Sequence, residues 1–251
     1  MKRGLFIFSI AFIAVLLFMV FFRNNIRDFA LEWKKKNLPP ITIQSGTIRP
    51  FAGINLDVPF LPQAPFGNWE LPYQEACEET SSILVDKFYK NELATPETVD
   101  KEILNLVDWQ KKRFGYYFHT TAKETAIMLR EYFGYKRVDV LTNVSAEDIK
   151  SHVMAAGRPV IVPLAGRLAA NPYYRQPGPV YHMLIIKGIT KNGDFITNDV
   201  GTKRGQNYVY DDKVLFNAIH DAPTGGDGWP VANPEEYIKT GAKTIVVVYS
   251  N

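Results

Sequence analysis

The only cysteine of this 251-residue chain, Cys77, lies at the start of a segment with helical spacing. Pro72 and Tyr73 precede it, and the apolar residues that follow it recur along one helix face. Backbone N–H groups and the helix dipole at such a position favour the thiolate, which is the form that attacks carbonyl carbons. The alternative interpretation is that a lone cysteine is a small buried apolar side chain.

Two further residues match this nucleophile. His182 opens an apolar run at a predicted strand start, and Asp199 ends the next predicted strand. Their separation of 17 residues fits two antiparallel strands and a turn, so we expect a hairpin to bring both side chains to one end of a sheet. An aspartate that accepts the Nδ1–H of His182 would fix its tautomer and leave Nε2 facing the thiol. The pattern predicts a catalytic unit of Cys77, His182 and Asp199.

Four motifs resemble those of the bacterial peptidases related to bacteriocin leader (double-glycine) processing enzymes, which belong to the papain-like superfamily. They are Val58-Pro-Phe-Leu-Pro-Gln63, the helix-start Cys77, Tyr181-His-Met-Leu-Ile-Ile-Lys-Gly188 and Asn198-Asp199. The resemblance covers residues 54–249 and implies a papain-like α+β fold that hydrolyses a peptide or amide bond. It implies that Cys77 is the nucleophile, His182 the base and Asp199 the orienting acid. It also implies that Gln63 helps the Cys77 N–H to form the oxyanion hole.

The chain departs from this family pattern at three places. Glu78 stands where Gly is common, and Glu79 follows it; two carboxylates suit a helix N-terminus but oppose thiolate formation. Gln63 lies 14 residues before the cysteine, so Gln74, three residues before it, is a rival oxyanion donor. Val200 follows Asp199 where Pro is frequent.

The order of the predicted elements indicates an α+β fold with an antiparallel sheet, because helices come first and most strands later. The long segments 165–179 and 221–243 contain no regular pattern; the first, with Arg167, Tyr173, Tyr174 and Arg175, either lines a substrate cleft or is a solvated loop. We expect the second to be a surface loop outside the core. The predicted helices are 77–89, 99–112, 122–133 and 145–156, and the predicted strands are 41–48, 54–60, 136–141, 159–164, 181–189, 194–198, 206–210 and 244–249.

The amino-terminal segment has the pattern of a membrane anchor. Residues 4–22 are 19 residues without a charge, which as a helix cover about 28 Å, and no small residues mark a cleavage site. We expect an uncleaved transmembrane helix that anchors a bacterial, single-pass protein, followed by a short amphipathic helix over 26–36. Residues 1–40 would then be anchor and linker, and 41–251 the peptidase-like domain. A very short tail before one large domain favours the extracytoplasmic face for that domain.

Charge and composition exclude several classes of function. Residues 1–40 hold seven basic and two acidic residues, so the remainder is mildly acidic and has no electrostatic footprint for nucleic acid. The four histidines stand singly, and we expect neither a metal nor a cofactor. The leading hypothesis is a membrane-anchored thiol hydrolase acting on a peptide or protein. Acyl transfer through the same thioester, or an inactive peptide-binding module, are the alternatives.

Overall fold

The computed structural model describes residues 20, 22–41, 53–154, 156–230 and 232–250. It divides into two compact units, residues 1–38 and 39–251. The predicted span over 4–22, apart from residues 20 and 22, and the predicted strand over 41–48, apart from residue 41, lie outside the described residues. Within these ranges, no helix combines the length and the apolar character that a bilayer crossing requires.

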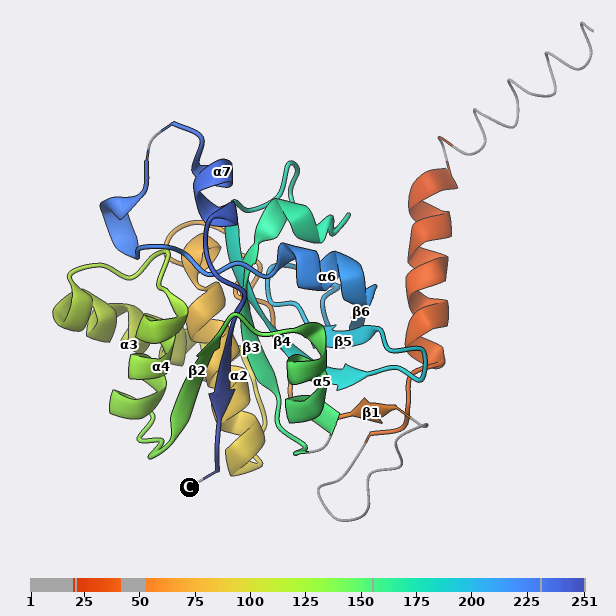
Figure 1. The fold of residues 1–251 in the computed structure, drawn as a ribbon, viewed down its shortest axis with the longest axis horizontal. Helices are drawn as coiled ribbons and strands as arrows, with labels where there is room; N and C mark the ends of the chain where they lie inside the picture. Colours follow the sequence, from red (N-terminus) through yellow and green to blue (C-terminus); the bar gives the residue numbers. More distant parts are fainter. Residues whose placement is uncertain (1–19, 21, 42–52, 155, 231, 251) are drawn as a thin grey trace, which may run out of the picture. The chain divides into compact units, whose positions relative to one another are not determined.

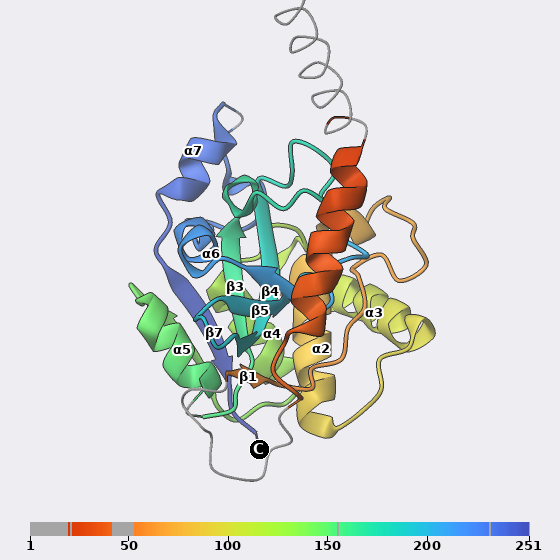
Figure 2. The ribbon, with the colours of Figure 1, turned by 90° about the vertical axis from the view of Figure 1, so that its right-hand side faces the viewer.

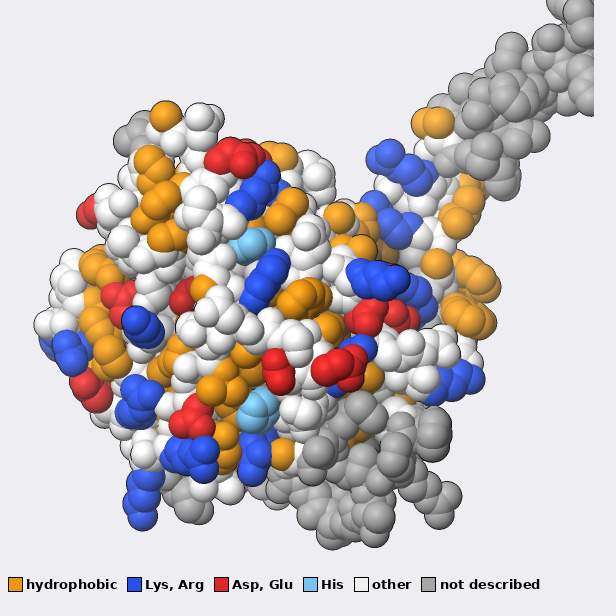
Figure 3. All heavy atoms as spheres, in the orientation of Figure 1, with side chains coloured by type: hydrophobic (Ala, Val, Ile, Leu, Met, Phe, Trp, Pro, Cys, Tyr) orange, Lys and Arg blue, Asp and Glu red, His pale blue; other side chains and the backbone are white. Residues whose placement is uncertain are grey.

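The smaller unit contains one described helix, residues 22–36, which begins earlier than predicted. It is amphipathic: Phe22, Ile26, Phe29 and Trp33 recur at helical spacing, and 43–74% of each is exposed. Figure 3 shows hydrophobic and basic side chains on the surface of this helix. The helix therefore presents an uncovered apolar stripe.

The larger unit is built on one antiparallel sheet with the order β2-β7-β3-β4-β5-β6, and β1 pairs with β4 (Figure 1). The central strand β4 is buried along all nine residues, so what it carries is held rigidly. The strands are β1 (Ile54–Asn55), β2 (Val138–Thr142), β3 (Val160–Ala165), β4 (Tyr181–Ile189), β5 (Phe195–Asn198), β6 (Tyr208–Tyr210) and β7 (Thr244–Val248).

Helices cover both faces of this sheet: α2, α3 and α4 lie on one side, and α5 and α6 on the other (Figures 1 and 2). Local chemistry sets their ends. Capping boxes begin α3 at Thr95 and α4 at Thr121, and Gly115 ends α3 in the left-handed conformation. The helices are α2 (Cys77–Lys90), α3 (Pro96–Phe114), α4 (Ala122–Glu131), α5 (Ala146–Met154), α6 (Asp212–Ala218) and α7 (Pro234–Lys239), with short 3-10 turns η1 (Tyr73–Glu75), η2 (Gly166–Ala169) and η3 (Gly226–Gly228).

The predicted α+β class, with helices preceding an antiparallel sheet, is confirmed. Two local predictions were wrong, and the helix α6 was missed. The expected strand over 54–60 is only the two-residue β1, and the segment 221–243 is not a surface loop outside the core. It contains α7, and its Ala222 and Ile238 are buried in the core with Trp229 and Tyr237 packed against them, so several apolar side chains fix it to the domain.

The visible surface carries acidic and basic side chains intermixed, without a continuous field of one sign (Figure 3). Binding to a nucleic-acid backbone needs a basic patch or stripe, which this face lacks.

Candidate active site

The hairpin of β4 and β5 brings His182 and Asp199 together. Ile185 pairs with Asn198 across it, and the turn closes with Thr190 N–H bonding to the Asp194 carbonyl, where Gly193 takes a positive φ. His182 Nε2 lies 2.9 Å from Asp199 Oδ1. Both side chains are buried, His182 at 2% and Asp199 at 0% exposure. The two residues therefore form a desolvated, hydrogen-bonded pair.

Asp199 is held by donors on both oxygens. Asn171 Nδ2 (2.9 Å), the Tyr174 hydroxyl (2.6 Å) and the Tyr210 hydroxyl (2.6 Å) donate to Oδ2, and Gly201 N–H donates to Oδ1 beside His182. Burial alone would raise the pKa of Asp199, but the charge of His182 and these hydrogen bonds hold it below its ordinary value. The carboxylate is thus fixed in place as an anion that orients the imidazole.

The ring nitrogen that meets Asp199 is not the expected one. The prediction gave Nδ1 to Asp199, but the structure gives it Nε2. The reason is local: Gly201 packs against the imidazole, because a Cβ there would lie 2.8 Å from His182 Cε1 and 3.1 Å from Nε2. The backbone after Asp199 therefore encloses the Nε2 edge of the ring.

Cys77 is the first residue of α2, as predicted, and is 6% exposed. It lines a cleft of about 930 Å³ whose wall also includes His182, Gln63 and Gln74. The backbone of Met183, the residue after His182, lies close enough to Cys77 to lower the pKa of its thiol. The fold therefore brings the helix start and the strand start to one cleft.

The thiol is not poised as a thiolate. Its hydrogen donates to Glu78 Oε2 at 3.0 Å, and among the described residues it makes no side-chain hydrogen bond to His182. Burial first, then the charge of Glu78, raise the pKa of Cys77 well above its ordinary value, and the Met183 backbone opposes them only in part. The lowered thiol pKa expected from the helix dipole is wrong, because the desolvated carboxyl next along the helix outweighs it.

Glu78 and Glu79 are themselves almost fully buried. Burial, followed by the charge of Glu79, raises the pKa of Glu78 well above its ordinary value. Burial also raises the pKa of Glu79 to about 8, although Gln110 donates a hydrogen bond to it. Burial therefore makes both carboxyls weaker acids than an exposed glutamate.

The two candidate oxyanion glutamines differ in the hydrogen bonds that their side-chain amides make. Gln63 is buried, and its Nε2 donates to the carbonyls of Tyr73 and Gln74, each at 2.9 Å. Gln74 is exposed in η1 and lines the cleft, and within the described part of the chain its side-chain amide has no hydrogen-bond partner. Gln63 thus fixes the turn before Cys77, and Gln74 offers an uncommitted amide there.

The segment before β4 lines the cleft through Tyr173, Tyr174 and Arg175, which is the first of the two predicted alternatives. Arg167 instead forms an ion pair with Glu235. The sequence analysis did not identify the hydrogen-bond partners of the central residues: Glu78 for Cys77, and Asn171 and Tyr210 for Asp199. Only Glu78 could have been found, because a carboxylate directly after the cysteine is unusual.

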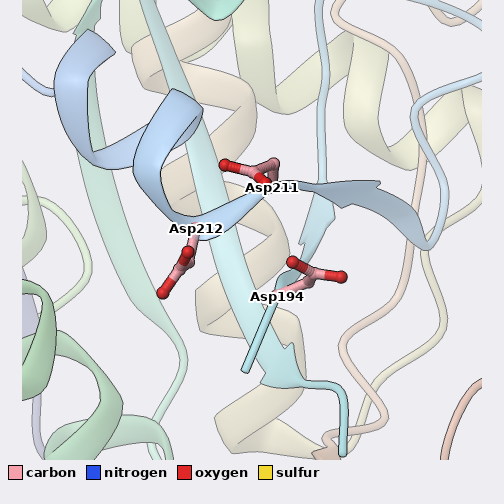
Figure 4. A group of neighbouring side chains, drawn as sticks. All are labelled: Asp194, Asp211 and Asp212. Carbon is pink, nitrogen blue, oxygen red and sulfur yellow. The ribbon is translucent and has the colours of Figure 1, made fainter. Parts of the chain in front are cut away.

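A group of three aspartates lies away from this cleft. Asp194, Asp211 and Asp212 place carboxylate oxygens within 4.8 Å of one another at the start of α6 (Figure 4). Asp211 caps α6 by accepting from Lys213 N–H and Val214 N–H, and Asp212 pairs with Lys150 Nζ at 2.9 Å. These contacts account for two of the three carboxylates as structural groups.

Comparisons with known proteins address the same part of the chain. The family model described as "Peptidase_C39 like family" matches residues 55–222. Curated proteins give no match. One similar solved structure is a fragment of prointerpain A from Prevotella intermedia, with 19% identity, a TM-score of 0.30, and coverage of 51% of this chain and 32% of that one. The chain thus spans about a third of that structure's length.

Proposed function

Because the chain belongs to the Peptidase_C39 like family and is therefore a papain-like cysteine peptidase, we propose that it hydrolyses a peptide or amide bond with Cys77, His182 and Asp199 as its catalytic unit. The observation that supports this most is the buried His182–Asp199 pair, 2.9 Å apart, at the cleft that also holds the only cysteine. An imidazole fixed by a carboxylate beside a thiol is the arrangement that nucleophilic thiol catalysis requires.

In the proposed reaction, His182 Nδ1 takes the proton of the Cys77 thiol, and the thiolate attacks the carbonyl carbon. Asp199 stabilises the imidazolium that forms, through the Nε2 hydrogen bond. The imidazolium then gives its proton to the leaving nitrogen, a thioester remains on Cys77, and water resolves it. Since the thiol donates to Glu78 at rest, a rotation of the Cys77 side chain toward His182 precedes the first step.

The oxyanion of the tetrahedral intermediate needs two donors. We assign one to the Cys77 N–H, because the first turn of a helix leaves its N–H groups without helical acceptors. The second is a glutamine amide. Gln74 holds an uncommitted amide, and Gln63 would have to release one of its two carbonyl bonds to take the role.

The decisive experiment tests whether peptide cleavage depends on the only cysteine and on its proposed base. A peptide library is incubated with the wild-type chain, with Cys77→Ala and with His182→Ala, and cleavage is read by mass spectrometry. We expect cleavage by the wild type alone, because the thiol and its base act as a unit. Cleavage that persists in Cys77→Ala would refute the assignment of the nucleophile.

Two alternatives remain open to the same assay. Acyl transfer would yield amide products when an amine acceptor is added, because the thioester accepts amines as well as water. The hydrogen bond from Cys77 to Glu78 favours a binding module without turnover, since it holds the thiol protonated. In that case the wild type would bind peptides and cleave none.

We also propose that residues 1–40 hold the domain at a membrane, with 4–22 as a single span and the domain on the extracytoplasmic face. The uncharged run and the apolar stripe of helix 22–36 support this, because such a stripe with basic neighbours suits a lipid headgroup layer. Ile13→Lys, placed mid-span, would cost about 3 kcal/mol and should release the chain from washed membranes. Recovery of the wild-type chain in the soluble fraction would refute anchoring. Protection of the domain from added protease in intact cells would show that the domain lies on the cytoplasmic face instead.

A further inference from the structure

Three cations line the cleft on the side of His182. Gly201 packs on the imidazole, and Lys203 and Arg204 follow it within the same turn. Arg175 follows Tyr174, whose ring lies 5.4 Å from that of His182. The Arg204 guanidinium lies 5.0 Å from the ring of Tyr173, so the two cationic segments meet.

No carboxylate of the cleft neutralises this side. The two carboxylates in its wall, Glu75 and Glu78, both belong to the chain around the start of α2. Glu78 accepts the Cys77 thiol, and Glu75 lies 3.7 Å from His119 Nδ1. Within the described part of the chain, neither Arg175 nor Lys203 forms an ion pair. Lys203 reaches across to the segment after Gln63, because its Nζ lies 2.9 Å from the position of a Cβ at Gly67.

The opposite wall is aromatic. The His119 and Trp229 rings stack with centroids 4.0 Å apart, and Trp229 meets Tyr181 edge-on at 5.7 Å. Burial first, and then charges that include those of Glu78 and Cys77, raise the pKa of Tyr181, so its hydroxyl lies near the start of α2. The carboxylates of the cleft therefore lie in an acidic half at the nucleophile, and its cations lie in a basic half at the imidazole.

The order of the chemical steps tells which part of a substrate meets each half. The acyl part stays on Cys77 as a thioester, so it lies over the start of α2. The leaving nitrogen takes its proton from His182, so the residues after the scissile bond lie over the imidazole and the loop 201–204. The basic half faces these residues.

From this division, and resting on the proposed function, we propose that the substrate carries carboxylates immediately after the scissile bond, received by Arg175 and Lys203. Aspartate or glutamate side chains and a free C-terminal carboxylate share this chemistry. An exposed ion pair contributes about 0.2–1 kcal/mol, so two together raise kcat/KM about two- to thirtyfold. Salt weakens the preference, because exposed pairs are screened.

The test uses matched quenched peptides that differ only after the cleaved bond: Asp-Asp, Asn-Asn, and Asn-Asn with a free or an amidated C-terminus two residues on. We expect the highest kcat/KM for the acidic peptides at 50 mM salt and a smaller ratio at 500 mM. Comparison of Asp with the free terminus separates the two sources of the carboxylate. A control peptide with Asp-Asp before the scissile bond should gain nothing.

The variant Arg175→Ala/Lys203→Ala should lose most of the ratio between the kcat/KM values on the Asp-Asp and Asn-Asn peptides. Lys101→Ala/Lys112→Ala, two exposed lysines on α3, is the matched control and should keep the full ratio. Equal kcat/KM for acidic and amide peptides in the wild type would overturn the inference and leave the proposed function intact.

If no peptide is cleaved, the proposed function fails and binding decides the inference separately. Fluorescence anisotropy of the same peptides with Cys77→Ala should show the acidic peptide bound more tightly, with the difference lost in the added Arg175→Ala/Lys203→Ala changes. Equal affinity for the acidic and amide peptides would overturn the inference by this route.

Discussion

Replacing Glu78 by glutamine removes the group that holds the Cys77 proton and keeps the side chain's shape. The sulfur and Oε2 lie 3.0 Å apart, and both residues are nearly buried. A carboxyl is a stronger acid than a thiol, so the first proton lost by the pair leaves Glu78, and the thiolate forms only beside an existing charge. Glu78→Gln removes that charge and lowers the pKa of Cys77.

The magnitude follows from the distance. Two unit charges 3.0 Å apart repel by about 1.4 kcal/mol at the dielectric constant of water and by about 5.5 kcal/mol at an effective value of 20. Because the site is buried, the repulsion exceeds the lower figure, and 1.4 kcal/mol is a factor of ten in an equilibrium. We therefore expect Cys77 of Glu78→Gln to react with iodoacetamide at least tenfold faster near pH 7.

The measurement is the rate of alkylation from pH 5 to 10, which is unambiguous because the chain has one cysteine. Glu79→Gln is the matched control: its charge is the least of the named influences on Cys77, so its profile should move less. Circular dichroism of each variant checks that it is folded. Coincident profiles for the wild type and Glu78→Gln would refute the view that Glu78 holds the thiol protonated.

Three further variants test the parts around this pair. Asp199→Asn turns an amide toward the three donors now on Oδ2, so it should lose about 1–3 kcal/mol of unfolding free energy in urea and most of kcat. Tyr210→Phe removes one donor only, so it should lose about 1 kcal/mol and keep its activity. Equal losses in the two variants would contradict this. Gln63→Ala should lower both stability and kcat, because Gln63 anchors the turn before Cys77. Gln74→Ala should lower kcat alone. An unchanged kcat in Gln74→Ala would assign the oxyanion role to Gln63 instead. Glu79 has a folded-state pKa of about 8 against an ordinary 4.5, so the folded chain binds the extra proton and stability falls as the pH rises, by about 1.4 kcal/mol per unit between pH 5 and 7. Urea midpoints measured against pH should show this slope, which is steeper near pH 5 because burial also raises the pKa of Asp221 to about 6. Glu79→Gln should flatten the slope. An unchanged slope in Glu79→Gln would show that Glu79 does not cause the pH dependence.

The sequence predicted those parts of the site that depend on local pattern. The apolar run of β4, the Gly193 turn and the polar residue at each end define a hairpin within 18 residues, so the proximity of His182 and Asp199 followed from register alone. The helix start at Cys77 was equally local. The seven residues of α6 were too short for a periodic signal.

The contacts that set the chemistry come from distant segments, and no periodicity reports them. Asn171 and Tyr174 reach Asp199 from one loop and Tyr210 from β6, and in the sequence each resembles an ordinary loop or strand residue. The choice of ring nitrogen depended on where the backbone of Gly201 passes the imidazole. The departure from the family pattern at Glu78 was visible in the sequence, but the orientation of the Glu78 carboxyl toward the sulfur depends on side-chain packing.

The site therefore contains two groups able to take one proton. Glu78 accepts the thiol hydrogen at rest, and His182 is fixed by Asp199 through Nε2; among the described residues, His182 Nδ1 makes no side-chain hydrogen bond. Burial raises the pKa of Glu78, and a protonated Glu78 no longer repels the thiolate. A substrate that dries the cleft further would strengthen the protonation of Glu78. Under the proposed mechanism, Glu78 therefore opposes thiolate formation only while it is ionised, and a bound substrate that keeps it protonated would remove this obstacle to proton transfer from Cys77 to His182.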